Sequence, residues 1–167
     1  EKHPDKTALI FLGTEFSYSE MAEYIKRFAS ALYEMGVREG EKLIIYIPNS
    51  PQWVIAWFGI QKAGGIAVPI TPIYTSYDLQ YIANDCGVET VICADTNYGY
   101  VQRAMAGSNI KRVIVTNVVD LLPWWKRVFG KAFDKVLAGK VSKDNKTYFF
   151  EKLIIKTISL PKTAGTK

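Results

Sequence analysis

Few side chains in this sequence could bind a metal ion or act as a nucleophile. The 167 residues include two cysteines, Cys86 and Cys93, and a single histidine, His3. A structural zinc site needs about four such ligands, so the sequence excludes one. Cys93 falls within an apolar, strand-like run, and both cysteines are interpreted as small buried hydrophobic residues. Because His3 lies close to the start of the chain, no Ser–His–Asp arrangement is expected.

The glycines do not form a recognisable phosphate-binding loop. No G-x-G-x-x-G follows a strand-like run, and no G-x-x-x-x-G-K-[ST] is present. Gly64 and Gly65 follow an apolar helical stretch and are interpreted as its C-terminal stop. Asp78 and Asp85 fall within another helical stretch, where a cap or a solvated position explains them. The sequence therefore predicts no catalytic, cofactor-binding or metal-binding residue.

A basic and aromatic segment around residue 127 is the strongest candidate for contact with another surface. Helical spacing from residue 123 places apolar side chains on one side and lysines and arginines on the other. Tryptophan combined with basic residues on such a helix is typical of helices that lie in a membrane interface. The alternative is a helix packed on its own domain or on another part of a larger protein. The predicted contact residues are Trp124, Trp125, Arg127, Phe129, Lys131 and Lys135.

Positive charge is concentrated in the same part of the chain. Residues 1–119 contain 10 Lys and Arg against 12 Asp and Glu, a net charge of −2. Residues 120–167 contain 11 against 4, a net charge of +7. A basic end on a nearly neutral body favours an anionic membrane surface as the partner of that end, with a solvated tail as the alternative. We expect no nucleic-acid partner.

The first residues predict a hairpin followed by a helix. Two β-prone runs, residues 7–12 and 15–18, flank a turn at Gly13. Residues 17–20 (SYSE) have capping-box spacing, and an apolar stripe at helical spacing follows them. Gly36 then ends this helix.

Four short apolar runs alternate with further helices. Each run is continuous, as in a strand that is covered on both faces. Ser50 and Pro51 mark the start of one helix. Residues 75–78 have capping-box spacing at the start of another, whose apolar stripe ends before Gly87. This order predicts an α/β fold, a parallel sheet with flanking helices, together with the N-terminal hairpin and a C-terminal amphipathic helix. The predicted strands are residues 43–47, 66–70, 90–94 and 112–116.

The pattern changes beyond residue 117, which predicts three parts. They are an N-terminal α/β subdomain (1–119), a basic amphipathic helical segment (120–146) and an incomplete continuation or tail (147–167). The first residue, Glu1, suggests a fragment, a processed chain or a trimmed one. No run of 18 apolar residues and no signal peptide is present. We expect a cytoplasmic protein with peripheral membrane contact.

Several short motifs occur in the order found in one enzyme family. They are residues 16–21 (FSYSEM), 47–53 (IPNSPQW), 62–72 (KAGGIAVPITP) and 74–79 (YTSYDL). Their order resembles the N-terminal part of the AMP-forming acyl-CoA synthetases of the adenylate-forming superfamily. Residues 117–135 (NVVDLLPWWKRVFGKAFDK) resemble the long-chain fatty acid–CoA ligase branch.

The resemblance implies a two-step ligase. ATP and a fatty acid form an acyl-adenylate, and coenzyme A then takes the acyl group; magnesium, ATP and coenzyme A are implied for the full-length enzyme. The family's phosphate loop, its magnesium-binding acidic residue and its adenylation lysine have no counterpart here, and residues 163–167 (TAGTK) echo the loop only faintly. We therefore expect the 167-residue chain to bind no cofactor and to be inactive alone.

A second hypothesis is that the chain has the same fold but no catalytic function. The chain would then be a non-catalytic Rossmann-like scaffold that binds a membrane or a protein partner through its basic helix. The downstream reading frame separates the two hypotheses. A phosphate loop encoded soon after residue 167 favours the enzyme, and a stop codon in an intact gene favours the scaffold.

Overall fold

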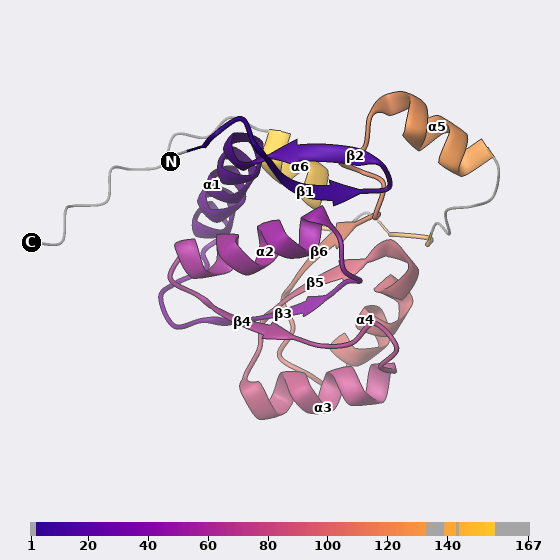
Figure 1. Cartoon of the computed structure of the whole chain (residues 1–167). Helices are drawn as coiled ribbons and strands as arrows, with labels where there is room; N and C mark the ends of the chain where they lie inside the picture. The colour runs from indigo at the N-terminus through magenta and orange to yellow at the C-terminus, as the bar shows by residue number, and fades with distance from the viewer. Residues whose placement is uncertain (1–2, 133–138, 143, 156–167) are drawn as a thin grey trace, which may run out of the picture.

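The fold is built on a five-stranded parallel sheet with helices on both faces (Figure 1). The computed structural model describes residues 3–132, 139–142 and 144–155, with residues 129–132 described by their backbone alone. The strand order is β4-β3-β5-β6-β7, and each neighbouring pair is parallel, which confirms the predicted sheet. The strands are β3 (Lys42–Tyr46), β4 (Ile66–Pro69), β5 (Thr90–Ala94), β6 (Arg112–Thr116) and β7 (Thr147–Phe149).

The fifth strand, β7, comes from a part of the chain whose structure the sequence left open. It pairs with β6 from Val113 opposite Thr147 to Val115 opposite Phe149, and α6 (Phe150–Ile155) follows it directly. The Phe150 ring stacks on the ring of Phe28, with a centroid distance of 4.5 Å. Residues 147–155 thus extend the sheet by one strand and add one helix to its cover. The three-part division of the chain stays a prediction.

Two layers of helices bury the two faces of the sheet. One core contains the apolar side chains of α1, α2 and α6, and the other contains those of α3 and α4. Within β3, Leu43 and Ile45 face the first core, whereas Ile44 and Tyr46 face the second. Full burial of a leucine or isoleucine side chain stabilises the fold by about 1.5–3 kcal/mol. The helices are α1 (Tyr18–Glu34), α2 (Pro51–Lys62), α3 (Ser76–Cys86) and α4 (Tyr98–Met105).

The predicted caps start and end these helices. The Ser17 hydroxyl accepts a bond from the backbone N–H of Glu20, whose carboxylate accepts one from the N–H of Ser17. Thr75 makes the same reciprocal cap at α3. Gly87 ends α3 in the left-handed conformation, with φ of 67°. These local bonds satisfy backbone groups that a helix end leaves open.

The hairpin consists of β1 (Thr7–Phe11) and β2 (Thr14–Ser17), as the sequence predicts. Its two turn residues, Leu12 and Gly13, have φ of 47° and 67°. A two-residue turn with both φ values positive matches the twist of the strands, but it favours Asn or Gly at the first position. Leucine there costs about 1–2 kcal/mol of backbone energy. Leu12 is the one non-glycine residue with positive φ among those described.

Candidate functional site

The predicted contact helix forms as α5 (Trp124–Ala132), directly after Pro123. Trp124 is 77% exposed and Trp125 is 47% exposed, and Val128 also faces solvent. Within the predicted helical segment 120–146, residues 133–138, and with them Lys135, lie outside the described part of the chain. No helix in the described part is both long enough and apolar enough to cross a membrane.

Two basic residues of α5 are bonded within the molecule. The Lys126 ammonium donates to the Leu12 carbonyl and to the Thr14 hydroxyl, both at 2.9 Å. Arg127 forms a two-point pair with Glu151 of α6, at 2.7 and 3.2 Å, and this bond raises the pKa of the guanidinium. Lys126 and Arg127 therefore attach α5 to the hairpin and to α6. Sequence spacing placed Arg127 on the polar side but did not reveal its partner.

The remaining predicted contact residues are only partly described. The side chains of Phe129 and Lys131 are outside the description, although their backbone belongs to α5. Trp124, Trp125 and Val128 are thus the described side chains that α5 presents to solvent. Contact by this helix with another surface stays a prediction.

A polar cleft of about 310 Å³ lies at the carboxyl ends of β5 and β6. The Asp95 carboxylate accepts bonds from the Asn117 side-chain amide at 2.8 Å and from the Gly139 backbone at 3.2 Å. The Asp120 carboxylate accepts from the Asn117 backbone at 2.7 Å and from the Thr116 hydroxyl at 3.2 Å. Burial raises the pKa of Asp120, opposed by these bonds. The cleft is therefore acidic, and the described donors to its two carboxylates are neutral amide and hydroxyl groups.

The sequence contains a pattern that indicates this cleft, although no recognised binding motif covers it. Asp95 directly follows β5 and Asn117 directly follows β6, and parallel sheets bind ligands at the carboxyl ends of their strands. Among the described residues, no group of three or more His, Cys, Asp and Glu side chains is placed to hold a metal ion. The cleft thus suits hydrogen bonding by a neutral or cationic group better than binding of phosphates.

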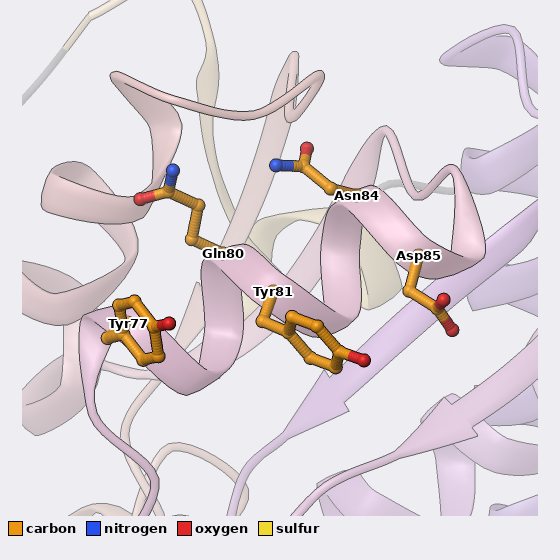
Figure 2. A pocket seen from close by; sticks show the side chains of 5 residues that line it. All are labelled: Tyr77, Gln80, Tyr81, Asn84 and Asp85. Atoms are coloured by element: carbon orange, nitrogen blue, oxygen red, sulfur yellow. The ribbon is translucent and has the colours of Figure 1, made fainter.

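A second hollow, of about 280 Å³, lies on the outer side of α3. Figure 2 shows Tyr77, Tyr81 and Asp85 along one side of the helix, with Gln80 and Asn84 pointing away from them. The two side-chain amides donate to the carbonyl of the Gly107 backbone at 3.1 and 2.9 Å, which ties α3 to the end of α4. Asp85, interpreted from sequence as a solvated position, lies at the edge of this open hollow. A single helix lines it, so it cannot enclose a small ligand.

The two cysteines and the two tryptophans of α2 are structural. Cys93 is fully buried in β5, and burial raises the pKa of its thiol; Cys86 is half-buried. Trp53 and Trp57 of α2 stack with a centroid distance of 5.4 Å and pack against the larger core. These side chains contribute packing rather than chemistry.

Known proteins share this arrangement. The family model described as AMP-binding enzyme matches residues 1–147. A long-chain-fatty-acid–CoA ligase from Bacillus subtilis (strain 168) is 31% identical over 127 residues, which cover 76% of this chain and 23% of that relative. A solved benzoate CoA ligase from Burkholderia xenovorans LB400 superposes with a TM-score of 0.75 at 23% identity, over 100% of this chain and 28% of that chain.

A solved long-chain-fatty-acid-CoA ligase from Archaeoglobus fulgidus superposes with a TM-score of 0.65 at 28% identity, over 69% of this chain and 25% of that chain. The parallel sheet, its two helical layers and the hairpin thus define the N-terminal α/β subdomain of the adenylate-forming fold. The chain belongs to the AMP-binding enzyme family. It spans 23% of the length of the curated relative from Bacillus subtilis.

Proposed function

We propose that this chain is the N-terminal α/β subdomain of a long-chain fatty acid–CoA ligase. The proposed reaction of the whole protein joins a fatty acid to ATP as an acyl-adenylate and then transfers the acyl group to coenzyme A. The observation that carries the proposal is the family match over residues 1–147, together with the likeness to named long-chain-fatty-acid–CoA ligases. The parallel sheet supplies the scaffold on which such a protein is built.

The described residues do not fit ATP and magnesium. The cleft at the carboxyl edge of the sheet presents the carboxylates of Asp95 and Asp120, which repel a triphosphate. No described cluster of three acidic or imidazole ligands is available for the ion. Positioning and neutralisation of phosphate charge are what adenylyl transfer requires. We therefore assign nucleotide and metal binding to the part of a ligase that these residues do not include.

Pyrophosphate exchange tests this division of labour. The 167-residue chain alone is expected to show no ATP–pyrophosphate exchange with palmitate and magnesium. The longer protein in which this chain continues is expected to show palmitate-dependent exchange, with benzoate as a control acid. Magnesium-dependent exchange by the 167-residue chain would contradict the proposal, because it would place the nucleotide site within these residues.

A second candidate function is contact of α5 with an anionic membrane surface, either in the ligase or in a non-catalytic scaffold. The exposure of Trp124, Trp125 and Val128 favours it. Burying one such large side chain in the interface could contribute about 1.5–3 kcal/mol. Each basic residue near an anionic surface could add about 1 kcal/mol. Because Lys126 and Arg127 are already bonded within the molecule, the apolar term is expected to dominate.

Vesicle binding tests this contact. The chain is expected to co-sediment with vesicles of phosphatidylcholine and phosphatidylglycerol, and more weakly as salt rises. Trp125→Ala is expected to weaken binding, whereas Ile73→Ala is the matched control, since Ile73 is exposed on the loop before α3. Equal binding by both variants and the unmodified chain would assign α5 to packing against protein.

A further inference from the structure

The turn of the β1–β2 hairpin lies beside α5 (Figure 1). Leu12 is 60% exposed, and Ile10 of β1 is exposed as well. Lys126 holds the turn against α5, because its ammonium bonds to the Leu12 carbonyl and the Thr14 hydroxyl. The turn and α5 are therefore adjacent, and their exposed residues together are here called the turn–α5 surface. Its apolar members are Ile10, Leu12, Trp124, Trp125 and Val128.

The side chain of Leu12 gains little from its position within the described structure. Its φ of 47° lies in the left-handed region, which disfavours leucine and suits asparagine or glycine. Its side chain is not buried, so no packing energy offsets this conformational cost. An unfavourable backbone conformation that presents an apolar side chain to solvent is a reason to look for a contact made outside the chain.

Lys126 also determines which kind of partner this surface fits. Its ammonium lies 5.2 Å from the centre of the Trp125 ring while it is bonded to the Leu12 carbonyl. A cation is thus held against the backbone of one residue with an exposed apolar side chain, Leu12, and near the ring of another, Trp125. Lipid headgroup phosphates and the acyl chains beneath them require this combination of a positive charge and apolar side chains. Residues 120–167 carry a net charge of +7, which has the same sign as the Lys126 ammonium and is opposite to that of an anionic lipid surface.

We infer that the hairpin turn is a second membrane-inserting element, which acts together with α5. Leu12 enters the acyl region beside Trp125, and Lys126 fixes the turn to the helix so that both enter together. The occupant is an anionic lipid surface. This inference rests on the proposed membrane contact of α5 and adds to it a role for residues more than 100 positions away in sequence, since Lys126 and Leu12 are 114 residues apart.

Leu12→Asn is the most informative change. Asparagine accepts the left-handed conformation, and the bond from Lys126 goes to the backbone carbonyl, so the turn is expected to keep its structure. Partitioning of the 167-residue chain onto phosphatidylcholine–phosphatidylglycerol vesicles is expected to fall about fivefold, as loss of a partly buried leucine requires. Ile73→Asn removes an exposed aliphatic side chain on the loop before α3 and is expected to leave partitioning unchanged.

The outcomes separate this inference from the proposed contact of α5. Loss of binding by Trp125→Ala with full binding by Leu12→Asn would overturn the role of the turn and leave the contact of α5 intact. Full binding by both variants, or no binding by the unmodified chain, would overturn both. Protection of the Leu12 and Gly13 amides from hydrogen exchange in the longer protein without vesicles would assign the surface to the rest of the ligase and overturn the inference.

Discussion

The amino edge of the sheet and the turn–α5 surface both contain basic residues, and they use them differently. At the amino edge, Arg112 pairs with Glu41 and donates to the Thr90 hydroxyl at 2.8 Å, so the charge is neutralised inside the fold. At the turn–α5 surface, Lys126 bonds to a backbone carbonyl and a hydroxyl, while Trp125 beside it stays exposed. At the amino edge the basic residue is paired and mostly buried, whereas at the turn–α5 surface an apolar side chain beside the basic residue stays exposed to solvent.

The difference shows that the number of basic residues in a segment does not by itself identify a contact surface. Arg127 belongs to the most basic part of the chain, yet it is paired with Glu151, as Arg112 is with Glu41. Apolar side chains without cover, such as Trp124, are the better indicator, because exposing them has a cost that only a partner removes.

Replacing Arg112 is expected to have the largest effect. The Arg112 side chain is 16% exposed, and Arg112→Ala leaves the Glu41 carboxylate, 18% exposed, without its cation. Removing one partner of such a pair is expected to lower the free energy of unfolding by about 3 kcal/mol. Urea unfolding of Arg112→Ala and of the unmodified chain measures this difference in the free energy of unfolding.

Lys111 provides the matched control for that change. It pairs with Glu89 at 2.6 Å, but its side chain is 64% exposed. Lys111→Ala is expected to change the free energy of unfolding by less than about 0.5 kcal/mol. Similar costs for the two substitutions would show that the amino edge is not a closed structural cluster.

Arg127→Ala is expected to have an intermediate effect on stability and a small one on lipid binding. It removes the two-point bond to Glu151, and both side chains are about one-third exposed. The free energy of unfolding is expected to fall by about 1 kcal/mol. Vesicle partitioning is expected to change less than in Trp125→Ala. The reverse order would mean that Arg127 leaves Glu151 to meet the lipid.

Leu12→Asn is expected to have a small effect on stability, and of the opposite sign. Relief of the left-handed conformation is expected to raise the free energy of unfolding by up to about 1 kcal/mol. Leu12→Val, with a β-branched side chain, is expected to lower it instead. Urea unfolding of both variants checks the sign, and a loss of stability in Leu12→Asn would show that the leucine packs within the fold.

The sequence predicted the local parts of this fold well. The caps at Ser17 and Thr75 and the glycine stop at Gly87 depend on residues within one or two turns, which a single sequence displays. The parallel strands followed from their alternation with helices. β7 was not identified, because three residues are too few to show a period, and only its pairing with β6 makes it a strand.

The candidate sites were predicted less completely, because their bonds join distant residues. Nothing in the sequence near Lys126 indicates its bond to Leu12, and nothing near Arg127 indicates Glu151. The acidic cleft could have been inferred from Asp95, which directly follows a buried strand. The exposure of Trp124 could not, because amphipathic spacing indicates two sides of a helix but not which side the fold covers.

The central claim is that this chain is the N-terminal subdomain of a long-chain fatty acid–CoA ligase. Its most direct test is mass spectrometry of the products that the longer protein forms from ATP, magnesium, coenzyme A and a mixture of butyrate, palmitate and benzoate. The expected result is palmitoyl-CoA as the main thioester, with AMP released in equal amount. Preferential formation of benzoyl-CoA, or no thioester and no AMP with any of the acids, would contradict the claim.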